Sequence, residues 1–486
     1  MSEVWTKQLY SVTAPPGRFG ELTDDEYFDF VKLLNVWQAK KARNAKRMQY
    51  YDGKMPLKDL GISIPPILQK IDISVGWPAK AVNALASRSV FDGFVAGAGD
   101  PEALNLALID NDFGTLYAQT VRDELIHSCA FFTVTHGGDG EPDALISAYS
   151  AERASALWDG RKKRVKCGMV VTEIGGAVGD PIEFVMFTND SVIRIMYSLG
   201  VWNMVRETHT MGRPLIEPMV FKRSNDRPFG RSRINRAVMS ITDDAVRFRF
   251  LMEIASEFYV APQRYILGAT DDLFADNSMW EAYIGNLLAI SRDENGDIPT
   301  VGQFPQMTMQ PLVDYMRQLA ASFAGETNIP VSYLGVIHDN PASAEAMHAA
   351  NEELIIEAQE LNSSNGAALR NIGLMVTAIL EETPINELTT EQRNILPKFR
   401  NPEQPSVVSS SDAIVKQVSA IPWIAETRVA LEKLGYSEEE IVRMTTDKRR
   451  VQANAVLDKL EAATAKTEPP PMPQTEDHNN AEPEGV

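Results

Sequence analysis

The stretch that decides the fold reads GETNIPVSYLGVIHDNPASAEA and spans residues 325–346. Residues 325–340 show no helical spacing of apolar side chains, so we expect them to be non-helical. A long helix is predicted to follow over 341–382, because Asn340 is a good N-cap and Pro341 fits the first helical turn. The stretch is therefore expected to lead into that long helix from an element upstream.

Two further helices are predicted upstream. One covers 310–324, with Pro311 in its first turn. The other opens at Pro228 and covers 228–258, where apolar residues recur in alternating steps of four and three. This seam is formed by Ile234, Val238, Ile241, Ala245, Phe248, Met252 and Ala255, and a second apolar face by Val246, Phe250, Ile254 and Phe258. Two apolar faces indicate either packing on both sides, as in a helical ring, or an ordinary central helix of a large domain.

The rest of the chain predicts a mainly helical α+β protein. Helices are expected over 23–51, where Thr23 and Glu26 can form a capping box, over 66–90 and over 115–128. Short β-prone segments separated by turns predict an antiparallel β region within 130–222. Its expected strands are 131–135, 144–149, 154–158, 165–173, 181–188, 191–197 and 202–207.

The C-terminal part shows a change of composition. The prolines of 383–405 indicate a linker, and 407–462 predicts a small helical unit with a capping box at Ser437 and Glu440. Residues 463–486 are rich in proline and acidic side chains, so we expect a disordered tail.

Composition narrows the function classes. The 486 residues predict two to four domains, and 44% apolar residues allow substantial cores. The formal net charge of −19 argues against a generic nucleic-acid coat, although a repulsive surface suits DNA that must slide past it. No signal peptide and no transmembrane run is predicted.

No catalytic or metal-binding constellation is found in the sequence. The two cysteines, Cys129 and Cys167, indicate buried thiols rather than a disulfide framework or a zinc site. The six histidines form no metal pattern, and no phosphate-binding loop or nucleophile elbow is present. We therefore expect no enzyme activity, no cofactor and no metal. A basic run on the first helix (Lys40, Lys41, Arg43, Lys46, Arg47) favours a solvated helix face.

Several segments, taken in order, resemble portal proteins of tailed bacteriophages. Residues 325–335 followed by 339–346 are similar to the family's segment between the second stem helix and the long wing helix. RPFGRSRI at 227–234 resembles the start of the first stem helix, and APQRYILG at 261–268 the first strand of the clip. YYDG at 50–53 and WPAKAV at 77–82 fit the long-tailed-phage branch, and the resemblance covers about residues 25–460.

The resemblance implies a ring-forming fold with wing, stem, clip and crown. Carried onto this chain, it places the wing at 1–226, stem helix 1 at 227–258, the clip at 259–307, stem helix 2 at 308–324, the tunnel loop at 325–341, the long wing helix at 342–385, a linker at 386–401, the crown at 402–462 and the acidic tail at 463–486.

The family's role implies partners. A portal forms a homo-oligomeric ring, usually of twelve subunits, at one capsid vertex of the virion. It nucleates procapsid assembly in the host cytoplasm among major capsid and scaffolding proteins. It docks the large terminase, conducts double-stranded DNA in packaging and ejection, and holds head-completion, adaptor and tail proteins, with no membrane involved.

Candidate site residues follow from this assignment. In the expected tunnel loop, the polar residues Thr327, Asn328, His338, Asp339 and Asn340 are predicted to face the DNA channel, with helix capping as the competing role of Asn340. On the first stem helix, Arg233, Arg236, Arg247 and Arg249 are predicted to bind carboxylates of neighbouring subunits, with DNA phosphates as the alternative.

Two rival classes remain. An enzyme of the packaging machine would need clustered carboxylates or a phosphate-binding loop, and the sequence has neither. Another minor capsid or scaffold-like structural protein is the alternative function. A scaffold would be more uniformly helical and would lack the β region within 130–222.

Overall fold

The computed structural model describes most of the chain. The described residues are 22–56, 73–96, 101–175, 180–198, 201–260, 264–267, 300–303, 308–336, 344–403, 407–436 and 438–465. They fall into two compact units, Met1–Glu403 and Gln404–Val486. Within these ranges, no helix is long and apolar enough to cross a membrane.

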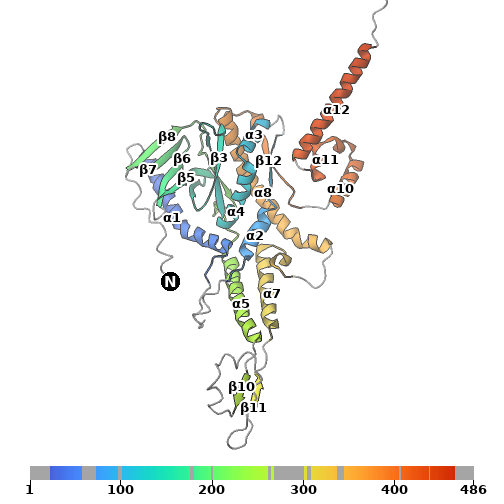
Figure 1. Ribbon diagram of the computed structural model, residues 1–486. Coiled ribbons are helices and arrows are strands. Elements are labelled where there is room, and N and C mark those ends of the chain that lie inside the picture. The colour runs from blue at the N-terminus through green and yellow to red at the C-terminus, as the bar shows by residue number, and fades with distance from the viewer. Residues whose placement is uncertain are drawn as a thin grey trace, which may run out of the picture. The chain divides into compact units, whose positions relative to one another are not determined.

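The first unit contains a five-stranded antiparallel sheet of order β4-β5-β6-β7-β8 (Figure 1). Its strands are Ala154–Asp159, Arg164–Gly175, Asp180–Phe187, Ser191–Ser198 and Val201–Thr208. Helix α1, Asp24–Asp52, covers it because Phe30, Leu33 and Trp37 pack against apolar side chains of β5, β6 and β7. The predicted capping box of Thr23 and Glu26 is confirmed, and α1 ends at Gly53 in the left-handed conformation.

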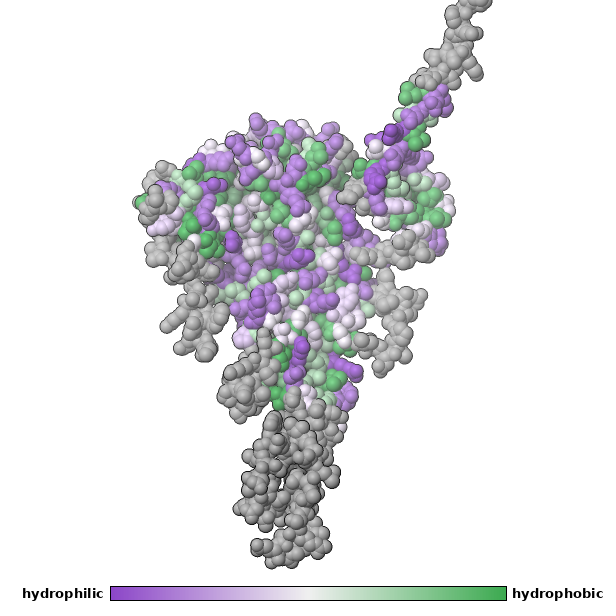
Figure 2. Space-filling view, in the orientation of Figure 1, coloured by the Kyte–Doolittle hydropathy of each residue, from purple (hydrophilic) through white to green (hydrophobic). Residues whose placement is uncertain are grey.

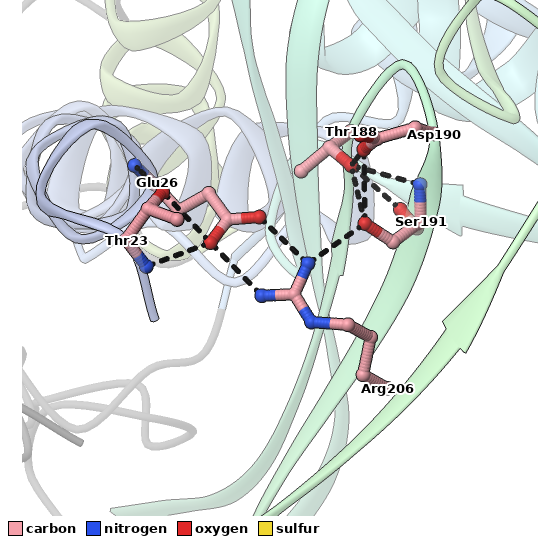
Figure 3. Close-up of polar contacts among 6 residues, drawn as sticks. All are labelled: Thr23, Glu26, Thr188, Asp190, Ser191 and Arg206. Carbon is pink, nitrogen blue, oxygen red and sulfur yellow. Dashed lines mark hydrogen bonds and ion pairs between the residues drawn. The ribbon is translucent and has the colours of Figure 1, made fainter. Parts of the chain in front are cut away.

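Polar contacts fasten the start of α1 to the sheet (Figure 3). Arg206 of β8 donates to both carboxylate oxygens of Glu26, at 2.8 and 2.9 Å, and to the Ser191 hydroxyl at 3.0 Å. The bonds from Arg206, opposed by partial burial and assisted by Thr23, lower the pKa of Glu26 to about 2. Because the folded pKa is depressed, this pair stabilises the fold above the unfolded pKa of 4.5, and the gain is lost as pH falls toward 2.

Replacing Arg206 with glutamine should lower the free energy of unfolding at pH 7 by about 1–2 kcal/mol, because a charge-assisted pair is lost at a partly buried site. Urea unfolding at pH 7 and pH 3 measures the effect, which should be smaller at pH 3. Arg194→Gln is the matched control. Arg194 pairs with Glu183 but is 61% exposed, so this variant should lower the free energy of unfolding by less than about 0.5 kcal/mol. Equal decreases in the two variants would contradict the stabilising role given to the pair of Arg206 and Glu26.

A three-stranded sheet of order β3-β2-β9 lies at the centre of the main core. Its strands are Ala144–Ser150, Cys129–His136 and Ile216–Val220. Helices α2 (Trp77–Ala86), α3 (Glu102–Asp110), α4 (Phe113–His127) and α8 (Ala344–Leu380) contribute to this core. Cys129 and Cys167 are buried and free, as expected.

Strands far apart in sequence form a separate pair. β1, Phe91–Ala96, pairs antiparallel with β12, Ile395–Phe399, which follows the short helix α9, Thr390–Arg393. The prediction that 386–401 is a linker is therefore wrong. Pro397 sits in β12, which pairs with β1 alone among the described strands, so its missing N–H costs little.

Two helices run side by side away from the sheets (Figure 1). They are α5, Arg236–Val260, and α7, Gln310–Thr327. Short strands β10, Arg264–Leu267, and β11, Thr300–Gln303, pair antiparallel between them in sequence. The second unit comprises α10, Val407–Ala420, the 3₁₀ turn η4, Pro422–Glu426, α11, Arg428–Lys433, and α12, Glu438–Ala465.

The mixed, mainly helical class and the expected strands within 130–222 are confirmed to within two residues at each end. Three helix predictions have wrong boundaries. α5 begins at Arg236 rather than at Pro228, and α7 continues to Thr327 instead of ending at Ala324. The helix expected over 66–90 is α2, which begins only at Trp77, next to Pro78, and ends at Ala86. The expected N-cap Asn340 and the Pro341 that follows it lie outside the described residues, as do Ser437 of the expected capping box and the tail beyond 465.

Candidate functional site

The connection that leaves α7 is more structured than expected. The Thr327 hydroxyl donates to the Phe323 carbonyl at 2.7 Å, which keeps the last turn of α7 helical. Asn328 then ends the helix in the left-handed conformation, φ 53°, a role that asparagine tolerates well. A 3₁₀ turn, η3, follows at Val331–Leu334. The part of 325–341 that the structure describes is therefore a helix end, a cap and a turn.

A buried arginine fixes the start of this connection. Arg233 donates from Nε to the Ala81 carbonyl at 3.0 Å, from Nη1 to Glu357 at 2.6 Å, and from Nη2 to the Thr327 carbonyl. Its side chain is only 3% exposed. One guanidinium therefore joins α2, α7 and α8.

Glu357 pairs with a second cation as well. Lys222 also binds Glu357, with 2.7 Å between Nζ and Oε1. Burial alone would raise the pKa of Glu357, but the charges of Arg233 and Lys222 outweigh it, and the pKa is lowered. The carboxylate is therefore ionised and holds both cations.

The 3₁₀ turn is tied to α8 by a second arginine. Arg88 donates to the Tyr333 hydroxyl at 3.2 Å and to the Asn351 side-chain oxygen at 3.1 Å. Tyr333 also donates to Asn351 at 3.2 Å. Residues 328–336 are thus positioned by polar bonds at both ends of the turn.

The paired helices share an apolar contact. The rings of Phe248 on α5 and Tyr315 on α7 lie 4.0 Å apart between centroids. Ala245, Val246 and Leu319 are buried nearby. Ala245 and Phe248 of the predicted apolar seam of α5 therefore pack inside the subunit.

The predicted stem arginines separate into two groups. Arg236, Arg247 and Arg249 lie on α5, where Arg236 and Arg249 are exposed and Arg249 donates to the Ser74 carbonyl at 2.7 Å. Arg233 precedes α5 and is buried within the subunit. The prediction that Arg233 binds a neighbouring subunit or DNA is therefore wrong, because its side chain is buried and each of its three nitrogens already donates within the subunit.

The predicted channel residues also separate. Thr327 is 3% exposed, so the prediction that its side chain faces a channel is wrong: the hydroxyl bonds within α7. Asn328 is half-buried at the helix end. His338, Asp339 and Asn340 lie outside the described residues.

One buried acid was not predicted. Glu124 of α4 is fully buried and accepts a bond from Asn365 of α8 at 2.9 Å. Burial raises its pKa to about 8. The residue sits in the core without access to a substrate. In the part of the chain that the structure describes, no three metal-binding side chains come together.

Comparison with known proteins finds a matching family and similar relatives. The profile of the family described as phage portal protein, SPP1 Gp6-like, matches residues 32–453. The chain is 25% identical over 447 residues to a portal protein of Mycobacterium phage L5, with 88% of this chain and 89% of that protein covered. It is 24% identical over 426 residues to a portal protein of Mycobacterium phage D29, with 84% and 86% covered.

Solved structures with a similar fold include a chain from the virion of a native gene transfer agent particle, at 13% identity and a TM-score of 0.44, covering 85% of this chain and 94% of that one. Another comes from the neck of the native particle, at 13% identity and a TM-score of 0.45, covering 80% and 95%.

Proposed function

This chain belongs to the phage portal protein family, SPP1 Gp6-like, and on that premise we propose that its copies assemble into a ring, of twelve subunits, at one capsid vertex. Double-stranded DNA passes through the ring in packaging and ejection. The ring nucleates procapsid assembly with capsid and scaffolding proteins, docks the large terminase, and later holds head-completion and tail proteins. It carries out no catalysis of its own.

The family match over residues 32–453 is the observation that carries this proposal, because it spans the sheets, the paired helices and most of the second unit. The net charge of the chain also supports this proposal. Each copy brings a formal net charge of −19, so a DNA duplex inside a ring meets a mostly repulsive wall, which favours sliding of the DNA over tight binding.

Negative-stain microscopy of the purified protein tests the ring. Rings with a central hole are expected. Monomers or filaments at micromolar concentration would overturn the proposal and favour another kind of minor capsid protein.

We assign the DNA-facing role to the segment after the 3₁₀ turn, including His338, Asp339 and Asn340, with Asn328 at its start. Exposed Arg236, with Arg247 and Arg249, binds carboxylates of neighbouring subunits in this proposal, since a ring needs lateral contacts.

Replacing residues 336–340 with a Gly-Ser linker of equal length should leave rings intact and reduce packaged DNA per particle at least about tenfold. The described bonds of Arg233 and Arg88 lie outside the replaced residues, so the subunit fold is retained. Rings are counted by microscopy, and packaged DNA by nuclease protection in a complementation assay. A Gly-Ser replacement of exposed residues 138–141 in the β2–β3 turn is the control. Normal packaging by the 336–340 variant would contradict the assignment.

A further inference from the structure

A basic cavity of about 600 Å³ opens between the second half of α1, the start of β2 and the loop 227–235. Its lining includes six cationic side chains and no carboxylate: Lys40, Arg43, Arg47, Arg227, Arg231 and Arg236. In a chain with a net charge of −19, this cavity has the opposite sign to the protein as a whole.

Two of these cations are available to a ligand. Arg47 donates to the His127 carbonyl at 2.7 Å, whereas the side chains of Arg43 and Arg231 are exposed and have no partner among the described residues. His127 also lines the cavity; it is 2% exposed and its Nδ1 has no partner within the described ranges. A buried polar nitrogen without a partner is costly, so a polar group brought into the cavity would relieve that cost.

The apolar part of the lining restricts the chemical class of ligand that fits the cavity. Trp37, Phe131 and Phe229 lie among the cations. A DNA duplex presents phosphates on a convex surface whose major groove alone is about 12 Å wide, and it cannot fill a cavity of this size. Aliphatic side chains flanked by carboxylates fit both features of the lining.

The same chain offers such a surface on α3. Leu106 is 52% exposed and Ile109 is 72% exposed, although the opposite face of this helix is buried in the core. Glu102 and Asp110 flank them and are exposed. Figure 2 shows hydrophobic residues at the surface over α3. We name these four residues the α3 ridge.

The basic cavity and the α3 ridge lie on different elements, because α3 packs on α4, α8 and β1, whereas the cavity is built by α1, β2 and the loop before α5. A surface that matches a different surface of the same molecule produces head-to-tail contacts, and these close into a ring when the rotation from one copy to the next closes.

We propose that the α3 ridge of one copy inserts into the basic cavity of the adjacent copy. Leu106 and Ile109 cover the apolar lining, and Glu102 and Asp110 pair with the cations around it. This inference rests on the proposed ring and names the lateral contact that closes it.

Charge reversal tests the contact. The cavity variant is Arg43→Glu with Arg231→Glu, and the ridge variant is Glu102→Lys with Asp110→Lys. All four side chains are exposed and have no ion-pair partner among the described residues, so each variant should fold. Mass photometry of the full chain measures the concentration at which rings form. Each variant alone should shift that concentration upward by about 100-fold, because like charges face each other.

Combination of the variants distinguishes a direct contact from a general charge effect. A chain with all four changes, and an equal mixture of the two variants, should form rings near the original concentration, because opposite charges meet again. Arg161→Glu with Lys162→Glu, at the exposed β4–β5 turn, is the control and should assemble normally.

The outcomes separate the two proposals. Rings from the unaltered chain and from both variants would overturn the inference and leave the ring proposal intact. Loss of assembly without rescue in the combinations would also overturn it. Normal rings with weakened binding of a DNA duplex would assign the cavity to DNA instead. Absence of rings in the unaltered chain would overturn the proposed function itself.

Discussion

Replacing Arg233 with methionine should lower the free energy of unfolding by about 3–5 kcal/mol. The substitution leaves Glu357 buried with only Lys222 beside it, and it removes the donors that bind the Ala81 and Thr327 carbonyls. The cost of unpaired buried groups exceeds the packing that the methionine side chain retains. Urea unfolding at one fixed protein concentration measures the loss.

Two further variants make the result specific. Arg236→Met, three residues away and exposed, should change stability by less than about 0.5 kcal/mol. Arg233→Met combined with Glu357→Leu should lower the free energy of unfolding less than Arg233→Met alone, because no buried charge is then left unpaired and Lys222, the other partner of Glu357, is 52% exposed. A double variant that loses the sum of the two single effects would contradict the role given to this ion pair.

Replacing Gly230 with alanine should cost more than about 4 kcal/mol or prevent folding. Gly230 has φ 66°, and a Cβ atom there would lie 2.0 Å from the Phe221 carbonyl oxygen and 2.7 Å from a methyl carbon of Val220. The carbonyl belongs to the backbone and also accepts the Arg231 N–H at 3.0 Å, so it cannot yield without moving the loop before α5.

Gly212→Ala distinguishes the cost of the left-handed backbone conformation from the cost of the steric clash of the added Cβ atom. Gly212 has the same φ of 66°, but nothing lies within 4 Å of the position of its Cβ atom. Its replacement should cost only about 1 kcal/mol, the penalty for the left-handed conformation. Thermal and urea unfolding of the two variants provide the comparison. Equal losses would mean that backbone strain alone accounts for Gly230.

Local sequence patterns predicted correctly those helices and strands that are determined by residues close together in the sequence. The capping box of Thr23 and Glu26 marks the start of α1 in both sequence and structure. The alternating segments within 130–222 became strands. The start of α5 was misplaced because tertiary bonds decide it. The Arg233 N–H donates to the Leu125 carbonyl at 2.8 Å, and Ser232 bonds to the Ile126 carbonyl, so 228–235 is held against the end of α4.

The candidate site was less predictable for a related reason. Arg233 and Arg236 are three residues apart and equally polar in sequence, yet one is buried and the other exposed. The partners of Arg233 come from positions 81, 327 and 357, which no local spacing brings together. In the sequence, Thr327 is a polar residue of a kind common in loops. In the structure, the burial of Phe323 and Ala324 keeps the last turn of α7, which contains Thr327, helical.

The pairing of β1 with β12 has a consequence during synthesis. About 300 residues separate Ala96 from Ile395, the nearest residues of the two strands. At 5–20 residues per second, a ribosome needs roughly 15–60 s to make that interval. Throughout it, β1 has both edges unpaired, because β12 is its only partner strand in the described sheets. Phe91 and Phe94 are then without the strand that helps to cover them, so the nascent chain depends on protection from aggregation until residue 399 has emerged.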